Sequence, residues 1–218
     1  MASVRVVGVT QPVTEDIKSV EHLIAYQARV SNTDNQDNLD YKGLLRYLWN
    51  HKHLSPFEMV NATLEIETTR DISRQILRHR SFTFQEFSQR YAEVQSFEER
   101  EARMQDPVNR QNSLETTSQS VQESFLKAQN DVLDVAQAKY LEALEMGIAK
   151  EQARALLPEG LAKTKMYMNG TLRSWLHYID LRGGNGTQKE HMEIANLCRE
   201  ALRPHFPLII DSIVGDTK

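Results

Sequence analysis

Hydrophobic residues recur along the chain with two different periods, and the changes between them separate strands from helices. A β-branched run from Val4 to Thr10 predicts a strand. Apolar and polar residues alternate from Val60 to Ile66, and this period of two predicts a half-buried antiparallel strand. The segment from Phe82 to Arg90 alternates as well, so Phe84 and Glu86 point the same way if it is extended.

The other apolar positions follow the helical period. They predict helices over residues 20–30, 41–50, 70–78, 153–157, 172–181 and 188–202. A longer helix is predicted from about Leu114 to Met146, with Gly147 as its stop, whereas the charged and irregular residues 96–112 predict a mobile excursion. Few strands and many helices indicate an α+β class. We expect a small antiparallel sheet with several helices, one of them long, in a single domain over residues 1–218.

The composition is that of an ordinary globular protein, with 40% hydrophobic and 26% charged residues among 218. No apolar run approaches the ~20 residues of a membrane helix, and the N-terminus lacks the apolar run of a signal peptide. The single cysteine, Cys198, excludes an intrachain disulfide and suits a reducing compartment. We therefore expect a cytoplasmic protein with no membrane role.

Positive charge is concentrated in one segment. Residues 70–90 contain five arginines, no lysine and only Asp71 and Glu86 as acids, which gives +3 and leaves −7 for the rest of a chain whose net charge is −4. A basic segment in an acidic protein favours an anionic ligand held at one place. Arginine suits phosphate because its planar group donates two parallel hydrogen bonds. The chain has neither a P-loop nor a G-x-G-x-x-G after its first strand, so side chains must hold much of any phosphate.

Other interpretations of these residues remain open. Arginines four apart at 70, 74 and 78 also fit a solvent-exposed helix face. The same arginines, with the aromatic residues near them, fit a module that binds RNA or DNA, although the acidic remainder of the chain argues against a long polyanion. His51 and His53 have no third ligand nearby, which argues against a metal site.

Two short motifs carry a more specific signal. Arg78-His79-Arg80 is followed, after seven residues, by Ser88-Gln89-Arg90, and this pattern resembles the signature of the flavin-dependent thymidylate synthases. Segments 28–31, 51–58, 73–75, 154–158 and 181–182 are also similar to that family and fall in the same order. The resemblance implies a homotetramer that makes dTMP from dUMP with FAD, methylenetetrahydrofolate and a reduced nicotinamide, for which we expect NADPH. It implies neither a nucleic-acid partner nor a metal.

The resemblance also implies roles for individual residues. Those matching FAD contacts are Ser31, His53, Ser55, Arg78, His79, Arg80, Glu86, Arg173 and His177. Those matching dUMP contacts are Gln75, Arg78, Glu86, Phe87, Ser88, Gln89, Arg90, Arg154 and Arg182. Arg182 is the expected catalytic residue, because a fixed guanidinium stabilises negative charge on the uracil carbonyls. Its position also suits a simpler role, an arginine that complements the dipole at a helix C-terminus.

An ordinary flavoprotein reductase is a further alternative, but it has no need of the second phosphate site that Gln75, Ser88, Arg90 and Arg154 imply. Cys198 lies in an apolar helical segment, where a thiol is usually inert, so we expect a mechanism without an enzyme nucleophile.

The chain departs from the family pattern after Arg182. Gln188 and Glu190 keep the family's spacing, but Gly186 replaces a histidine, and Thr187 and His191 replace an alanine and an isoleucine. Any FAD contact made by the family's histidine therefore cannot be transferred to this chain. Thr171 and His177 likewise stand where the family often has asparagine. Arg173 and His177 are four residues apart and fit one helix face, so a packing or surface role for them is an equal alternative to a ligand contact.

Overall fold

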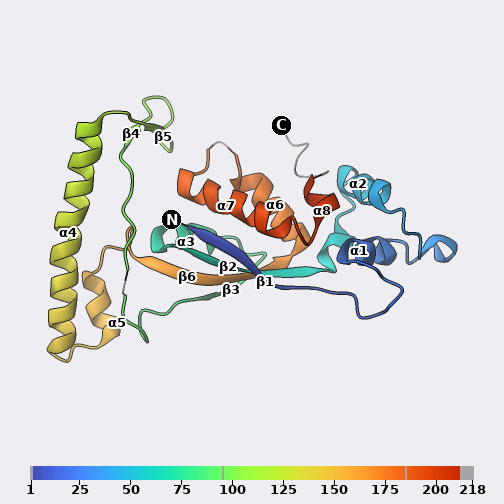
Figure 1. The fold of residues 1–218 in the computed structure, drawn as a ribbon, viewed down its shortest axis with the longest axis horizontal. Coiled ribbons are helices and arrows are strands. Elements are labelled where there is room, and N and C mark those ends of the chain that lie inside the picture. Colours follow the sequence, from blue (N-terminus) through green and yellow to red (C-terminus); the bar gives the residue numbers. More distant parts are fainter. Residues whose placement is uncertain (1, 95, 185, 212–218) are drawn as a thin grey trace.

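The computed structural model describes residues 2–94, 96–184 and 186–211, and a four-stranded antiparallel sheet lies at its centre (Figure 1). The strand order is β1-β2-β6-β3, formed by β1 (Ser3–Val9), β2 (Asn61–Thr69), β6 (Lys163–Thr171) and β3 (Thr83–Glu86). β2 and β6 pair along their whole lengths, with Asn61 opposite Thr171 and Thr69 opposite Lys163. These two central strands determine where the helices that follow them begin.

In the part of the chain that the structure describes, helices cover one face of the sheet. α3 (Arg70–Ile76), α6 (Leu172–Arg182) and α7 (Lys189–Leu202) lie on that face (Figure 1). The alternation along β2 and β6 directs Leu64, Ile66, Met166 and Met168 into the core beneath these helices, where Trp175 is also fully buried. The hydrophobic effect acting on this set holds the covered face together.

The opposite face of the sheet is polar. Arg5 Nε donates to Glu65 Oε1 at 2.7 Å, and the Tyr167 hydroxyl donates to Glu65 Oε2 at 2.8 Å. These hydrogen bonds lower the pKa of Glu65 to about 2, so the carboxylate remains ionised in neutral solution.

α3 and α6 each continue directly from a central strand. α3 begins one residue after Thr69 and α6 one residue after Thr171. Because β2 and β6 are antiparallel, the two helices begin at opposite ends of the sheet and run toward each other over the same face. A nine-residue strand is about 30 Å long, and helices of seven and eleven residues together span about 27 Å. Their C-terminal ends therefore meet above the sheet.

The remaining elements form two groups at the ends of the molecule (Figure 1). One contains α1 (Val20–Ala28), α2 (Lys42–Asn50), α8 (Pro207–Ile209) and the 3-10 helices η1 (Thr33–Asn35) and η2 (Ser55–Glu58). The other contains the long helix α4 (Gln119–Glu145), the hairpin of β4 (Arg103–Gln105) and β5 (Ser113–Glu115), α5 (Lys150–Ala153) and the 3-10 helix η3 (Arg154–Leu156).

Two glutamines attach α4 to the extended segment before the hairpin. Gln129 accepts from the backbone N–H of Arg100 at 2.7 Å and donates to its carbonyl at 2.9 Å. Gln122 pairs in the same way with Ala102, at 2.8 and 3.0 Å. Each side-chain amide thus takes the place of a neighbouring strand. These four bonds satisfy backbone groups that no strand pairs.

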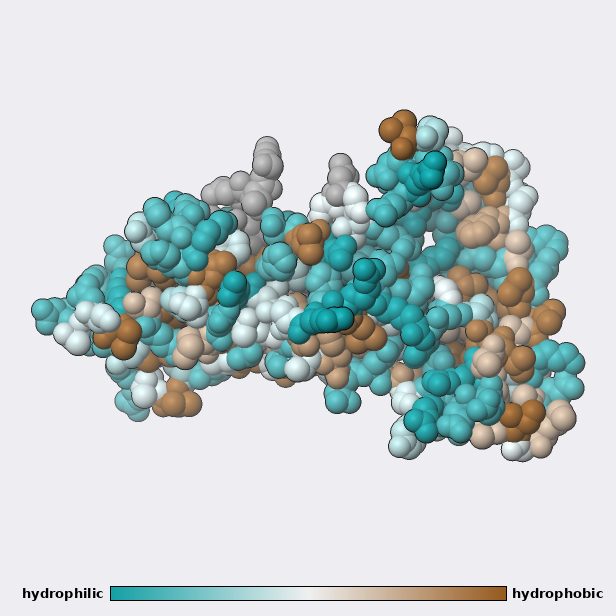
Figure 2. Space-filling model, turned by 180° about the vertical axis from the view of Figure 1, so that it is seen from behind, coloured by the Kyte–Doolittle hydropathy of each residue, from teal (hydrophilic) through white to brown (hydrophobic). Residues whose placement is uncertain are grey.

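Much of the apolar surface of α4 remains uncovered in the single chain. Val132, Val135 and Leu141 are each more than half exposed. Figure 2 shows hydrophobic side chains gathered along the edge of the molecule that α4 forms. A contiguous exposed apolar surface often marks a site where another protein binds.

The predicted α+β class is confirmed, and each predicted helix is present within a few residues of its expected bounds. Strand β6 was not predicted, although Thr164, Met166, Met168 and Gly170 alternate with polar or exposed residues. Of the segment 82–90, only Thr83–Glu86 is a strand.

Residues 96–112 are not irregular throughout, as the sequence predicted, because Arg103–Gln105 form strand β4. The long helix begins at Gln119 and not at Leu114. Residues 103–105 and 113–115 pair as a hairpin, which withdraws Leu114 from the helix. No helix among the described residues is long and apolar enough to cross a membrane.

Gly170 tests how tightly β6 is packed. A Cβ at this position lies 2.4 Å from a ring carbon of Phe82, whose ring packs on Trp175 at 4.8 Å between centroids. We expect Gly170→Ala to lower the free energy of unfolding by about 1–3 kcal/mol through overpacking. Gly43→Ala is the control, because no atom lies within 4 Å of its added Cβ in α2, and alanine favours the helix. Denaturant unfolding measures both, and wild-type stability of Gly170→Ala would contradict this packing.

Candidate active site

The meeting point of α3 and α6 places a histidine against an arginine. Arg182, the last residue of α6, donates from Nε to His79 Nε2 at 3.1 Å. Burial, followed by the positive charge of Arg182, lowers the pKa of His79 to about 4. The ring is therefore neutral at pH 7, with its proton on Nδ1. A neutral acceptor orients the guanidinium of Arg182 without adding a charge beside it.

Four of the arginines expected in the site lack a carboxylate partner within the described ranges, namely Arg78, Arg80, Arg154 and Arg182. By contrast, Arg90 pairs with Glu151 at 3.2 Å and Arg173 pairs with Glu58. Arg78 and Arg182 lie close enough to His79 for their charges to lower its pKa. Positive charge gathered without acidic partners favours the binding of an anionic ligand.

A second group of expected residues lines a cleft of about 400 Å³ beside α3 and η3, and includes Gln89 and Arg154. Arg70 and Arg74 line the same cleft and pair with Glu159. Arg154 differs from these two, because its side chain donates to the backbone carbonyl of Glu151 at 3.3 Å. Among the arginines that line this cleft, Arg154 therefore has a guanidinium that is not neutralised by a carboxylate and can bind an anionic ligand.

Arg70 does not belong to a solvent-exposed helix face. Its side chain is 12% exposed and lies 3.6 Å from Glu86 Oε1, whereas the Arg74 side chain is 59% exposed. The interpretation of Arg70, Arg74 and Arg78 as a single solvated face is therefore wrong for the first of them.

Glu86, the last residue of β3, is hydrogen-bonded to α3 and β6. Its Oε1 accepts from Ser73 Oγ at 2.7 Å and from Thr164 Oγ1 at 2.9 Å. The next residue, Phe87, donates its backbone N–H to the backbone carbonyl of Lys165 at 2.8 Å, and Ser88 Oγ accepts from the backbone N–H of Arg90 at 3.3 Å. These contacts hold residues 86–90 in a defined turn, with Gln89 buried.

The residues expected at the other end of the site lie apart from this centre. Ser55 lines a cleft of about 390 Å³ between α1 and η2, Ser31 follows α1, and the His53 ring is 6.1 Å from Tyr47 between centroids. Arg173 joins this end through Glu58 in η2. Arg173 and Arg182 are nine residues apart on α6, which separates them by about 14 Å along the helix.

One chain therefore brings Gln75, Arg78, His79, His177 and Arg182 together where α3 and α6 converge, and Arg80 follows His79 directly in the chain. It leaves Ser31, His53, Ser55 and Arg173 at the η2 end.

Three residues beside Gln75 were not expected in the site. Gln188, Tyr178 and His191 form a chain of hydrogen bonds with it, and His191 is fully buried. His191 falls on the apolar face of α7 with Ile194 and Cys198, a sequence signal for burial but not for the partners it finds.

Cys198 is itself fully buried, and burial raises the pKa of its thiol. A buried thiol of this kind is poorly suited to act as a nucleophile.

Comparison with known proteins identifies the family. A family model described as "Thymidylate synthase complementing protein" matches residues 13–208. The chain is 48% identical over 213 residues to a probable flavin-dependent thymidylate synthase of Paramecium bursaria Chlorella virus 1, covering 97% of this chain and 98% of the relative. It is also 48% identical over 209 residues to the flavin-dependent thymidylate synthase of Synechocystis, covering 94% and 96%. The chain belongs to the flavin-dependent thymidylate synthase family.

A solved structure agrees with this assignment. The UMP/dUMP methylase PolB from Streptomyces cacaoi, bound with 5-Br UMP, superposes with a TM-score of 0.85 at 25% identity, covering 99% of this chain and 94% of that one. The resemblance to flavin-dependent thymidylate synthases that Arg78-His79-Arg80 and Ser88-Gln89-Arg90 indicated is thus confirmed for the family as a whole.

The neutral state of His79 predicts a dependence of stability on pH. The folded protein holds the pKa of His79 at about 4, whereas an unfolded histidine titrates near 6.5. The unfolded state therefore binds the proton first, and stability is lost as pH falls from about 6.5 to about 4. One such histidine contributes a slope of up to about 1.4 kcal/mol per pH unit. Urea unfolding across this range should show a smaller slope for His79→Gln than for the wild type.

His51→Gln is the control, because this histidine is exposed and is not among the groups whose charge lowers the pKa of His79. An unchanged slope in His79→Gln would contradict a neutral, half-buried His79.

Proposed function

We propose that this protein converts dUMP to dTMP by reductive methylation, as a single domain in the cytoplasm. Methylenetetrahydrofolate donates the carbon, NADPH supplies the two reducing electrons, and FAD is the cofactor. The observation that carries the proposal is the contact of Arg182 with neutral His79, beside Arg78 and Arg80, whose guanidinium groups have no carboxylate partner in the described part of the chain. Family membership supports the same assignment.

The chemistry of the donor set fits a dinucleotide with a pyrophosphate. Arg78 and Arg80 offer unpaired guanidinium groups, and the Nδ1–H of His79 is a further donor. The residues that would hold FAD are Arg78, His79, Arg80, Glu86 and His177, with Ser31, His53, Ser55 and Arg173 from the η2 end. Bound FAD supplies reversible hydride chemistry that no amino-acid side chain provides.

Arg154 suits the phosphate of dUMP, because a monoester carries nearly two negative charges and Arg154 is the cation its cleft leaves without a carboxylate. Gln75, Arg78 and residues 86–90 would complete the nucleotide site. The turn that Glu86 and Ser88 stabilise positions the backbone and side chains of Phe87, Gln89 and Arg90.

Arg182 is the residue that would act on the base. His79 takes its Nε, so both terminal nitrogens of the guanidinium remain for a carbonyl oxygen. A fixed cation at that position stabilises the negative charge that develops on the uracil ring, at no cost of reorientation. Cys198 takes no part, because its thiol is buried in the core beneath α7.

We further propose that the active protein is a homotetramer. Two features support this. The η2 end and the convergence of α3 and α6 hold parts of one expected site that a single chain leaves apart. The long helix α4 also exposes Val132, Val135 and Leu141 to solvent. Contact between copies covers such surface and brings separated groups together.

Activity and flavin binding test the proposed function. We expect the purified protein to show flavin absorption bands and to form dTMP from dUMP, methylenetetrahydrofolate and NADPH. Arg182→Ala should retain the bands and lose turnover by about 10²- to 10³-fold, the effect of removing one donor to a developing negative charge. Arg199→Ala, whose side chain pairs with the adjacent Glu200, is the control. A colourless wild type that neither takes up added FAD nor forms dTMP would refute the assignment.

Sedimentation tests the assembly. Val135→Asp places a charge on the apolar surface of α4, where Val135 is 63% exposed in the single chain. A charge buried without a partner in an interface costs several kcal/mol, so this variant should sediment as a smaller species than the wild type. Lys127→Ala on the same helix is the control, since Lys127 pairs within the helix with Asp131 at 2.6 Å. A wild type that sediments as one chain would exclude the tetramer.

A further inference from the structure

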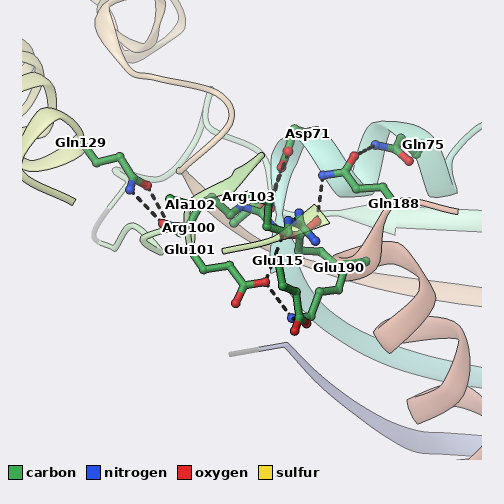
Figure 3. A network of polar contacts seen from close by, with 12 residues as sticks. Asp71, Gln75, Arg100, Glu101, Ala102, Arg103, Glu115, Gln129, Gln188 and Glu190 are labelled. Carbon is green, nitrogen blue, oxygen red and sulfur yellow. Dashed lines mark hydrogen bonds and ion pairs between the residues drawn. The ribbon is translucent and has the colours of Figure 1, made fainter. Parts of the chain in front are cut away.

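An unbroken line of hydrogen bonds crosses the protein from α6 through α7 and α3 to the start of α7. The Tyr178 hydroxyl is 3.1 Å from His191 Nε2, and His191 Nδ1 is 3.3 Å from Gln75 Oε1. Gln75 Nε2 then donates to Gln188 Oε1 at 2.7 Å, and Gln188 Nε2 donates to Glu190 Oε2 at 2.9 Å. Figure 3 shows the end of this line, where Gln75, Gln188 and Glu190 lie beside Arg100, Arg103 and Asp71.

Glu190 anchors the line with a fixed charge. Its Oε1 accepts from Arg103 at 2.5 Å and lies 3.2 Å from Arg100, which also pairs with Asp71 at 3.0 Å. Burial acts to raise the pKa of Glu190, but the hydrogen bonds and charges around it, that of Arg103 foremost, bring the net pKa below its ordinary value. Glu190 is therefore ionised, and an ionised carboxylate only accepts hydrogen bonds.

The carboxylate fixes the direction of every bond behind it. Gln188 must turn its amide nitrogen to Glu190, so its oxygen faces Gln75. Gln75 must then turn its nitrogen to Gln188 and its oxygen to His191, so the proton of the imidazole lies on Nδ1. His191 Nε2 is left to accept from the Tyr178 hydroxyl. A reversed amide anywhere in the line would set two donors or two acceptors against each other.

His191 is suited to this place because its ring stays neutral. Its side chain is fully buried, and burial, together with the charge of Arg182, lowers its pKa to about 4. Tyr178, also fully buried, keeps its proton because burial raises its pKa. A neutral imidazole has one donor and one acceptor on opposite sides of the ring, which is what the line requires.

Two members of the line, Gln75 and Tyr178, reach the proposed site. Gln75 is an expected contact of the nucleotide and retains one N–H and one lone pair for a ligand. The Tyr178 ring meets the His79 ring edge to face at 4.9 Å, and His79 holds Arg182.

We propose that His191 is a positioning residue, which, held by Tyr178 and acting together with Gln188, keeps the Gln75 amide in the orientation in which it meets dUMP. The proposal rests on the proposed function, since that function places dUMP beside Gln75. His191 itself touches neither substrate nor reacting atoms.

Two substitutions separate positioning from simple packing. Asparagine places an amide nitrogen near the position of Nδ1, so His191→Asn keeps the bond to Gln75 and gives up the bond to Tyr178. Glutamine reaches the position of Nε2, so His191→Gln keeps the bond to Tyr178 and releases Gln75. Each variant loses one hydrogen bond, and their melting temperatures and FAD contents should therefore fall together.

The dissociation constant of dUMP, measured by equilibrium dialysis against the FAD-loaded protein, should distinguish the two. We expect His191→Gln to raise it about fivefold to tenfold, the size of one net hydrogen bond, and His191→Asn to keep it within about threefold of the wild type. Equal weakening in both variants, or wild-type affinity in His191→Gln, would overturn the proposal.

A second measurement needs neither dUMP nor activity. Two-bond ¹H–¹⁵N correlation spectra of histidine-labelled protein, with the His191 signal assigned by its loss in His191→Gln, report which ring nitrogen carries the proton. We expect the proton on Nδ1, and a proton on Nε2 would overturn the line whatever the protein binds. A wild type with the Nδ1 proton that does not bind dUMP would instead count against the proposed function and, with it, the role of His191 toward dUMP.

Discussion

The antiparallel pairing of β2 with β6 is the constraint on which the site depends. Each strand runs without a loop into a helix on the same face, so α3 and α6 begin at opposite ends of the sheet and converge. The combined length of these helices nearly equals the length of the strands. A parallel pairing would start both helices at one end and leave Arg182 far from His79. The 3.1 Å contact of Arg182 with His79 thus follows from the topology of the sheet.

Charge is arranged differently in the framework and in the site. Glu65, Glu86 and Glu190 each lie within reach of an arginine, which stabilises the ionised carboxylates where they are partly or wholly withdrawn from water. Arg78 and Arg182 lie near each other with no such partner among the residues described. Their mutual repulsion destabilises the fold in the absence of ligand, and a neutral His79 beside them adds no further positive charge. Anionic ligands remove that cost when they bind, which couples ligand binding to stability.

The sequence predicted the helices well because their apolar residues recur over several turns, as in α6 and α7. It failed at β6, where Lys163, Lys165 and Tyr167 alternate with Thr164, Met166 and Met168, because threonine and methionine carry a weaker hydrophobic signal than valine or isoleucine. Leu114 was placed in the long helix because an apolar residue seven positions before Val121, about two helical turns, fits either element. Its pairing with Met104 places it in a strand.

The site was predicted in its residues but not in its grouping. Motif spacing indicated Arg78, His79 and Arg182, but it does not show that α3 and α6 bring them together. The partners of Gln75 were not predictable, since Gln188 and His191 are 113 and 116 residues away along the chain. Contacts of that kind follow from tertiary packing, and a single sequence holds no local pattern for them.

The segment from Arg100 to Arg103 joins the two halves of the molecule. Its backbone pairs with Gln129 and Gln122 of α4, while the side chains of Arg100 and Arg103 hold Glu190 at the start of α7. An extended chain makes this possible, because its hydrogen-bonding edges and its side chains point in different directions. The same few residues therefore set the position of the exposed helix α4 and the carboxylate that orients Gln75.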